Sequence, residues 1–330
     1  MDDEHADRTV RRDEALAAAL EAAFPDRTVA AVDDTGPSWN EANRTAAVRF
    51  GDGGRAFLKL ATDGESARVV RERAAIGHVR VNREVGAPEV LASDPDHDSP
   101  YLATAPIAGQ PLHRLWADAD EDGRDRLARA VGRALAALHA ERFPEHGRIR
   151  GGGSEGLDLD AAPWPDVLAA TVAEMRALAV SERYDGLYDD VLAAVEANRD
   201  LLSGAPAALL HGDPAKPNAF RAGSRVGFVD WERAHVGDPA RELVRVREQQ
   251  LDPLRGSAPE RLVAALHAGY REHAGGLPEG FAQRRPVYEA VRLLGVAGFF
   301  EHHVAFLDAD PEELGTWLED EMARRLDAVS

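Results

Sequence analysis

The sequence of 330 residues contains no cysteine, which excludes disulfide bonds, thiolate metal sites and cysteine nucleophiles. It has no long apolar run either. The longest, around Leu293 to Phe300, falls far short of the ~20 residues that a membrane helix needs. The acidic N-terminal segment lacks a basic start followed by an apolar core, so we expect no signal peptide. We therefore expect a cytoplasmic globular protein of about two domains, with no membrane partner.

Lysine is the other scarce residue. The chain has 39 Lys plus Arg, but the only lysines are Lys59 and Lys216, and 58 Asp plus Glu bring the formal net charge to -19. Such an acidic chain would repel the phosphates of DNA or RNA, so we expect no nucleic-acid partner. At about 1 M salt the Debye length falls to about 3 Å and the self-repulsion of the surface fades. The composition is therefore typical of a salt-rich cytoplasm, as in a halophilic archaeon.

Residues 1–108 combine strand-like runs with helical patterns. The acidic segment 1–24 and residues 65–82 have helical spacing. The turn residues Gly51 to Gly54 separate two strand-like runs and predict a hairpin. The strand-like runs are at 28–32, 45–50, 55–61, 87–93 and 100–107. We predict an N-terminal lobe built on a small antiparallel sheet, followed by a linker at Gly109.

Residues 109–330 are mostly helical in pattern. The helical stretches are at 124–143, 165–180, 185–202, 238–250, 259–274, 282–306 and 311–328. Two strand signals interrupt them, at 207–213 and 225–232. The predicted fold class is α+β, with two lobes: a small antiparallel sheet in residues 1–108 and a helical lobe in residues 109–330. Two motif lookalikes, G-x-G-x-x-A at 51–56 and G-x-S-x-G at 152–156, lack the flanking helix that each needs and are interpreted as turns.

The stretch from His211 to Glu232 carries the chemistry. Asp213 closes one apolar strand, Asn218 follows in a loop, and Asp230 closes the next apolar strand. If these two strands pair, two carboxylates and a carboxamide converge. Phosphoryl transfer needs such a set, because oxygen ligands hold Mg²⁺ against the phosphates and a further carboxylate orients the attacking hydroxyl. The alternative is that both aspartates only cap turns.

The segments HGDPAKPN and FVDWE resemble the H-G-D-x-x-x-x-N and D-W-E signature of the aminoglycoside phosphotransferase and choline kinase family. That family has a protein-kinase-like fold. The resemblance runs in order from about Val29 to Glu248. It implies that Asp213 is the catalytic base or the carboxylate that orients the hydroxyl, that Asn218 and Asp230 ligate Mg²⁺, and that His211 is a structural member of the loop. Lys216 is left with three interpretations: a γ-phosphate contact, a substrate contact or an exposed loop lysine.

The N-terminal lobe resembles the nucleotide-binding part of that family. FLKLA places Lys59 where the family has the lysine that holds the α- and β-phosphates, and Glu72 where its helix-borne partner stands. SWNEANRTAAVRF resembles the nucleotide-positioning loop and second strand, which implies a nucleotide contact for Asn43. PYLATAPIAGQPL resembles the segment behind the adenine, which implies contacts for Ala105 and Ile107. The compact charge of a lysine suits the phosphate role, and a lysine exposed at a sheet edge is the alternative for Lys59.

Three departures from the family pattern stand out. No G-x-G-x-x-G is present in the first lobe, where Gly36 stands alone. Glu242 stands where the family often has aspartate, and Asp238 with Pro239 also reads as a helix N-cap followed by proline at the first helical position. Residues 145–205 and 251–330 carry no motif, so the acceptor is not identified.

The resemblance implies ATP-dependent phosphorylation, with GTP as an alternative donor, of a small-molecule hydroxyl between the lobes. The acceptor could be an amino alcohol, a sugar or an aminoglycoside-like compound. Two other functions stay open: a non-catalytic nucleotide-binding regulator and an atypical protein kinase. The presence of Lys59, Asp213, Asn218 and Asp230 together disfavours the regulator. The H-G-D loop, and the lack of an evident activation segment after Asp230, disfavour the protein kinase.

Overall fold

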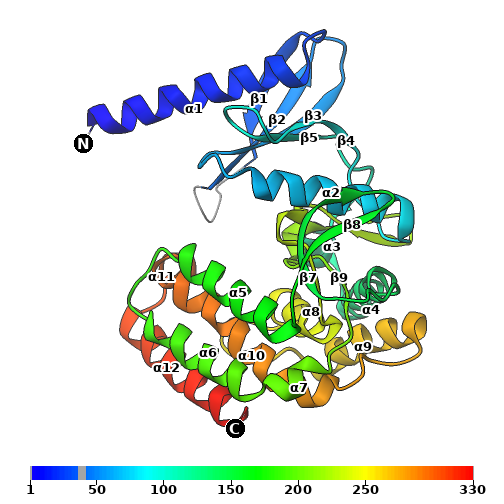
Figure 1. The fold of residues 1–330 in the computed structure, drawn as a ribbon, viewed down its shortest axis with the longest axis vertical. Helices are drawn as coiled ribbons and strands as arrows, with labels where there is room; N and C mark the ends of the chain where they lie inside the picture. Colours follow the sequence, from blue (N-terminus) through cyan, green and yellow to red (C-terminus); the bar gives the residue numbers. More distant parts are fainter. Residues whose placement is uncertain (1, 36–41, 330) are drawn as a thin grey trace. The chain divides into compact units, whose positions relative to one another are not determined.

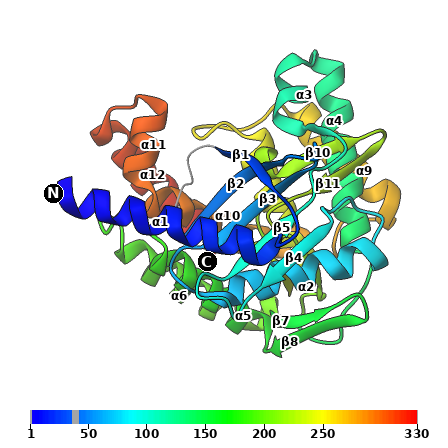
Figure 2. The same cartoon turned by 90° about the horizontal axis from the view of Figure 1, so that it is seen from above.

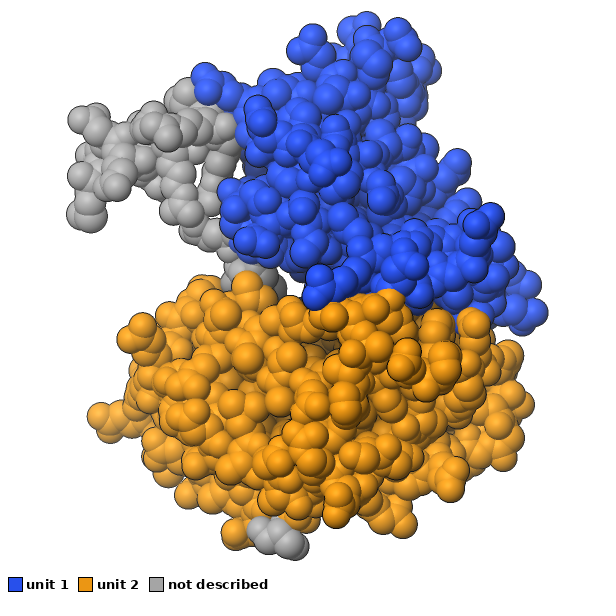
Figure 3. Space-filling view, in the orientation of Figure 1, with its two compact units in different colours: residues 1–115, 149–158, 217–234 blue, residues 116–148, 159–216, 235–330 orange. Residues whose placement is uncertain are grey.

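The computed structural model describes residues 2–35 and 42–329, with side chains from Asp13 onward. The chain forms two compact units, each assembled from three stretches (Figure 3). Unit 1 contains residues 1–115, 149–158 and 217–234, and unit 2 contains residues 116–148, 159–216 and 235–330. The chain therefore returns twice to unit 1 after the first crossing. The functional division into residues 1–108 and 109–330 stays a prediction.

Unit 1 is built on the predicted antiparallel sheet, with strand order β1-β2-β3-β5-β4 (Figure 1). Its strands are β1 (Val29–Asp34), β2 (Asn43–Phe50), β3 (Arg55–Ala61), β4 (Val90–Asp94) and β5 (Tyr101–Thr104). The predicted hairpin joins β2 to β3. Its turn needs a glycine, because Gly53 has a φ of 85°, in the left-handed region that side chains disfavour.

The alternation of side chains along β3 gives the sheet two different faces. Ala56, Leu58 and Leu60 point into an apolar core that includes Leu16 and Leu20 of helix α1 (Asp2–Ala23). Successive strand residues point to opposite faces, so Lys59 points the other way. There it meets Glu72, which is buried on helix α2 (Ser66–Asn82). One strand thus contributes to the core and presents a single cation on the opposite face.

A hairpin in unit 1 carries the second part of the site. Strands β10 (Ala219–Ala222) and β11 (Arg225–Phe228) pair antiparallel, and β6 (Gln110–Pro111) pairs with the outer edge of β10. The N–H of Val229 donates to the carbonyl of Asn218 at 2.9 Å. The backbones of Asn218 and Asp230 therefore lie at the same end of this hairpin.

A four-stranded sheet corrects one expectation. Its order is β8-β7-β12-β9, with β7 (Gly147–Gly153), β8 (Gly156–Ala161), β9 (Ala208–Leu210) and β12 (His235–Gly237). The expected pairing of the strands at 207–213 and 225–232 is wrong. β9 pairs with β12, whereas β11 pairs with β10, because a tight turn at Gly223 brings the four-residue β10 directly beside it. The G-x-S-x-G lookalike forms the turn between β7 and β8, as predicted.

Unit 2 is mostly helical, as predicted, and two of the expected helices are each divided in two. Residues 185–202 form α6 and α7, and residues 282–306 form α10 and α11, which meet at Phe299. The helices are α3 (Leu112–Asp118, which begins in unit 1), α4 (Glu121–Leu138), α5 (Trp164–Ala177), α6 (Gly186–Ala197), α7 (Arg199–Ser203), α8 (Pro239–Val246), α9 (Glu260–Ala274), α10 (Phe281–Gly298), α11 (Phe300–Leu307) and α12 (Pro311–Asp327). A π-helical turn, η3 (Arg247–Leu251), extends α8.

Two packing arrangements organise these helices (Figures 1 and 2). Helices α5, α6, α10 and α12 surround a large apolar core. Helices α4 and α9 cross closely at Gly132 and Gly269, where an added Cβ would lie 2.0 Å from the carbonyl oxygen of Leu266 and 1.9 Å from that of Arg129. No single helix in the described ranges is long and apolar enough to cross a membrane; α10 and α11 pass that test only together, across a 76° bend.

Candidate active site

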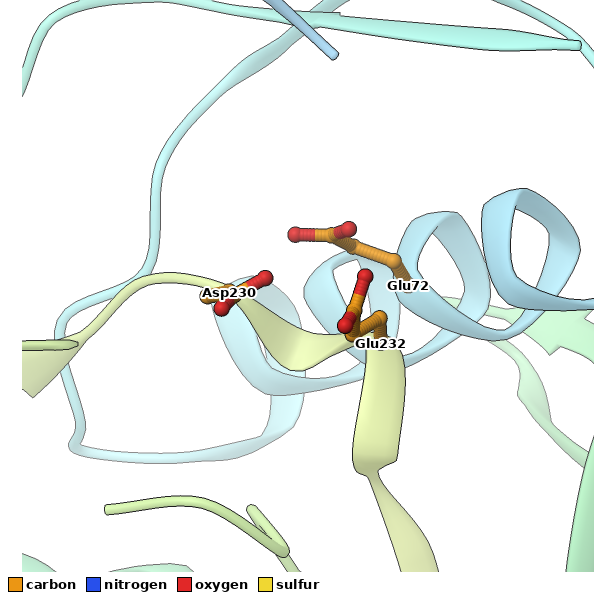
Figure 4. A group of neighbouring side chains, drawn as sticks. All are labelled: Glu72, Asp230 and Glu232. Carbon is orange, nitrogen blue, oxygen red and sulfur yellow. The ribbon is translucent and has the colours of Figure 1, made fainter. Parts of the chain in front are cut away.

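Lys59 contacts three carboxylates of unit 1, and we call these four residues the Lys59 cluster. Figure 4 shows the three carboxylates, Glu72, Asp230 and Glu232. The Lys59 ammonium is 2.9 Å from Glu72 Oε2 and 2.7 Å from Glu232 Oε2, and it also contacts Asp230 Oδ1. One oxygen atom from each of the three carboxylates lies within 4.8 Å of the others. The expected pair of Lys59 and Glu72 is therefore present, and Lys59 is not an exposed edge lysine.

The chain after β11 is fixed around this cluster by contacts with α2. Glu72 Oε1 accepts a hydrogen bond from the backbone N–H of Trp231 at 3.1 Å, and the guanidinium of Arg71 donates to the carbonyl of Glu232 at 2.9 Å. Asp230 itself has a left-handed backbone, with φ 66° and ψ 61°. Non-glycine residues in this region carry a conformational cost and concentrate at functional sites. The backbone of Asp230 agrees with the site role predicted for it, which stays a prediction.

The charges of the cluster shift the pKa values of Lys59 and Glu72. Burial alone would lower the pKa of Lys59, but the carboxylates of Asp230, Glu72 and Glu232 outweigh it and raise that pKa well above its usual value. Burial raises the pKa of Glu72, and so do Asp230 and Glu232, against the opposing effect of Lys59. Three carboxylates thus share one ammonium. The net charge of the cluster is therefore negative, which favours a further cation such as a divalent metal ion.

The donors that the sequence assigns to Mg²⁺ fit that ion chemically. Mg²⁺ prefers oxygen ligands and is usually held by one or two carboxylates together with substrate phosphates. Asp230 has 38% of its side chain exposed, so its carboxylate is accessible, and Asn218 lies at the same end of the hairpin. Glu232 adds a second carboxylate beside Asp230, one that the sequence does not assign to the metal.

The predicted nucleotide contacts are only partly near this cluster. Asn43, at the start of β2, donates from Nδ2 to Glu232 Oε2 at 2.7 Å and is thus joined to the Lys59 cluster. Ala105 and Ile107 follow the end of β5 and are half-buried, and the N–H of Ala105 donates to the carbonyl of Glu89 at 2.8 Å. Gly36 and most of the predicted nucleotide-positioning loop lie outside the described residues. The nucleotide contacts of Asn43, Ala105 and Ile107 stay predictions.

In unit 2 the loop after β9 holds Asp213. Gly212 has a φ of 83°, which explains why the H-G-D motif needs glycine at its centre. The side chain of His211 is fully buried, and its Nδ1 accepts a hydrogen bond from the N–H of Asp213 at 3.2 Å. His211 thus has the structural position predicted for it.

A buried carboxylate holds the backbone of this loop. Glu242 of α8 accepts from the N–H of Gly212 at 2.7 Å and from the N–H of His211 at 3.1 Å. His139, at the end of α4, lies 2.9 Å from the same carboxylate through Nε2 and 3.1 Å from the hydroxyl of Tyr270 through Nδ1. Burial alone would raise the pKa of Glu242, but these hydrogen bonds and the nearby imidazoles lower it to about 2.

The carboxylate of Asp213 is oriented by two side chains on one face of α8 and η3. Arg245 donates to Oδ1 at 2.7 Å, and Gln249, four residues later, donates to the same oxygen at 2.6 Å. Gln249 belongs to the π-helical turn, and such turns are frequent at functional sites. Both of these contacts come from unit 2, and 24% of the Asp213 side chain is exposed.

The remaining predicted residues are also in unit 2. Lys216 is half-buried, with its ammonium 4.4 Å from the centre of the Trp116 ring, so it is not a freely exposed loop lysine. Burial and the charge of Arg124 lower its pKa. Asp238 caps α8 through a bond from the N–H of Ala240 at 2.9 Å, as expected. It is fully buried and also accepts hydrogen bonds from Arg284 and Tyr288, both at 2.6 Å.

Several side chains that contact the predicted site residues are not identified by the sequence. Glu232 is the third member of D-W-E, and that motif could have identified it. Arg245 and Gln249 carry no comparable signal, because their contact with Asp213 depends on how α8 and η3 pack beside the loop. The sequence marks Glu242 only as a departure from the family pattern. In the structure its carboxylate accepts hydrogen bonds from two backbone N–H groups of the H-G-D loop.

Comparison with known proteins agrees with this geometry. A family model described as the phosphotransferase enzyme family (APH) matches residues 35–287. No curated protein matches the sequence. Among solved structures, aminoglycoside phosphotransferase APH(4)-Ia is 16% identical, with a TM-score of 0.61 over 96% of this chain and 98% of that chain. A Thermobifida fusca protein named as a candidate fructosamine-3-kinase is 22% identical, with a TM-score of 0.57 over 93% and 97% of the two chains.

A third solved structure is the GDP and kanamycin complex of an APH(2") enzyme, which is 14% identical, with a TM-score of 0.59 over 92% and 97% of the two chains. At these identities the likeness establishes the fold, which confirms the predicted α+β, kinase-like architecture. The family model goes further, because it matches well over half of the sequence. This chain therefore belongs to the phosphotransferase enzyme family.

Proposed function

We propose that this family member transfers the γ-phosphate of ATP, or of GTP, to a hydroxyl group of a small molecule, with Mg²⁺ as the metal, in a salt-rich cytoplasm. The observation that carries the proposal is the Lys59 cluster, in which Lys59 contacts Glu72 and the left-handed Asp230. Related structures carry names of enzymes that act on small hydroxyl compounds, and one contains a nucleotide with kanamycin.

The residues of unit 1 would bind the phosphoryl donor. Lys59 would hold the α- and β-phosphates, with Glu72 fixing the direction of its ammonium. Asn218 and Asp230 would hold Mg²⁺. When bound, the ion would offset the charge of the β- and γ-phosphates. The donor phosphates would then replace some of the carboxylate contacts that Lys59 makes in this structure.

The residues of unit 2 would act on the acceptor. Asp213 would orient the acceptor hydroxyl and take its proton as the hydroxyl oxygen attacks the γ-phosphorus and ADP leaves. Glu242 and His211 hold the backbone of the loop, and Arg245 and Gln249 hold the carboxylate. Such fixed positioning is the main contribution that a protein makes to phosphoryl transfer.

Two matched substitutions test these roles. Asp213→Asn keeps the shape but removes the base, so we expect turnover to fall by about 10²–10⁴ while Mg·ATP binding survives. Asp230→Asn should weaken the Mg²⁺-dependent binding of ATP itself. Calorimetric titration of Mg·ATP, with ATP consumption measured against a metabolite library at high salt, separates the two effects. If both variants bound Mg·ATP like the wild type and no acceptor gave turnover, a non-catalytic nucleotide-binding regulator would replace the enzyme.

A further inference from the structure

Arg292 of α10 is a charged side chain that has no partner within the described residues. No hydrogen bond or ion pair joins its guanidinium to any of them, and its Nε is completely buried. The residue as a whole is half-buried, and a cation that has lost part of its hydration favours an anionic partner. Burial, followed by the charge of Arg245, lowers the pKa of Arg292 to about 10, so it stays charged at neutral pH.

The charged groups around Arg292 do not supply the missing anion. The groups that act on it are the guanidiniums of Arg245 and Arg325 and the carboxylates of Glu248 and Asp213. Glu248 Oε1 is already 3.0 Å from the guanidinium of Arg325. Oδ1 of Asp213 already accepts from Arg245. Arg325 is also paired with Glu321. Arg245 and Arg325 thus have carboxylate partners, whereas Arg292 has none among the described residues.

The same place holds other unsatisfied polar atoms. Nε of Arg245 and Oε1 of Gln249 are also buried and have no hydrogen-bond partner. Both side chains contact Asp213 through another atom of the same polar group, Nη2 of Arg245 and Nε2 of Gln249. Native interiors leave few such atoms unpaired, and those that occur call for a specific explanation. Here the unpaired donors belong to two neighbouring arginines beside the loop aspartate, which is the chemistry that binds an oxyanion.

We propose that Arg292, with Arg245 beside it, binds an oxyanion of the acceptor, so that the acceptor is an alcohol that carries a carboxylate or a phosphate. The inference rests on the proposed function, in which Asp213 orients the acceptor hydroxyl. Arg245 links the proposed oxyanion site to Asp213. It contacts Asp213, and its charge acts on Arg292. A polycationic acceptor such as kanamycin would be repelled by this pair of guanidiniums.

The first experiment compares acceptors that differ in charge. ATP consumption is measured with D-glycerate and glucose 6-phosphate, with the neutral alcohols glycerol and glucose, and with the cations ethanolamine and kanamycin. Turnover should favour the anionic alcohols, and the better of the two identifies the oxyanion. Arg292→Met should raise the KM for that alcohol by about 10- to 100-fold, the range of a lost charge-assisted contact, with little change in kcat or in the KM for ATP.

The second experiment detects the oxyanion without turnover. At constant ionic strength, inorganic phosphate or acetate should raise the thermal midpoint of the wild type but not that of Arg292→Met. The matched control is Arg133→Met, on α4, where the arginine is half exposed and 3.4 Å from Glu272. That variant should keep the response. Without added anion, Arg292→Met should have a midpoint no lower than that of the wild type, because it removes a half-buried charge that has no paired anion among the described residues.

The outcomes separate this proposal from the proposed function. If only neutral or cationic alcohols were phosphorylated, with Arg292→Met unchanged, the phosphotransferase would stand and the oxyanion subsite would be rejected. If Arg292→Met unfolded at a lower temperature and still responded to phosphate and acetate, Arg292 would be a structural residue. If Mg·ATP failed to bind, the phosphotransferase would fall, and the anion response alone would decide whether Arg292 forms an anion site.

Discussion

The carboxylate of Glu242 should stabilise the folded protein in a way that depends on pH. A carboxylic acid whose pKa falls from 4.5 to about 2 on folding contributes about 3 kcal/mol to the free energy of unfolding at neutral pH. Because the pKa is lower in the folded state, the contribution is complete above about pH 5 and is lost as the pH falls toward 2. The bonds from His139 and from the N–H groups of His211 and Gly212 account for it.

The substitution Glu242→Gln removes this contribution while keeping the size of the side chain. One carboxylate oxygen becomes an NH₂ group, which faces a donor instead of accepting from it. We expect the variant to lose about 3 kcal/mol at pH 7, in the range found when a buried polar network is broken. The difference from the wild type should shrink by about 1 kcal/mol when the pH is lowered to 3.5, since part of the Glu242 contribution is then lost.

Urea unfolding at high KCl, followed by circular dichroism at several pH values, measures this difference. Glu196→Gln is the control, because that carboxylate is exposed and pairs only with the neighbouring Arg199 among the described residues. Hydrogen exchange adds a local measurement, since the amides of His211 and Gly212 should exchange faster in Glu242→Gln. An equal loss of stability at pH 7 and pH 3.5, with unchanged exchange at these two amides, would refute the reasoning.

Two further predictions concern the scarce lysines and the acidic composition. Lys59→Arg should reduce kcat/KM for ATP by more than about 30-fold, the equivalent of about 2 kcal/mol, whereas Lys216→Arg should cost less. Near-normal turnover of Lys59→Arg in a steady-state assay would mean that the phosphates bind elsewhere. With 58 carboxylates against 39 basic groups, the thermal midpoint should rise between about 0.1 and about 2 M KCl. A flat or falling curve would contradict adaptation to high salt.

The parts of the site that could be predicted are those encoded in short, ordered motifs. Lys59 and Glu72 stand thirteen residues apart on adjacent elements, a strand and the following helix, so their contact follows from local folding. The H-G-D motif is predicted to end a strand; the strand β9 ends at Leu210, and the motif forms the loop that follows, where the turn at Gly212 needs its glycine. In these places the pattern of the chain and its packing agree.

The parts that could not be predicted depend on tertiary packing. The strand β10 has only four residues and gives no clear signal in the sequence. The strand signals at 207–213 and 225–232 were therefore wrongly expected to pair with each other. Arg245 and Gln249 reach Asp213 from more than thirty residues away in sequence. Gln249 does so from a π-helical turn that has no sequence signature. Arg292 lies on a helix whose sequence shows only a mixed apolar pattern, so its lack of a partner emerges only from the folded structure.

The geometry also accounts for a lysine at position 59 in a chain that otherwise uses arginine. Three carboxylate oxygens within 4.8 Å of one another converge on one nitrogen, which suits a compact ammonium with three donors. A planar guanidinium would spread its donors and fit this point less well. The same reasoning does not explain Lys216, because an arginine stacks on an aromatic ring at least as well as a lysine does. The ring of Trp116 therefore gives no reason for lysine at position 216, and a contact with the transferred phosphoryl group or with the substrate, as predicted from the sequence, would give one.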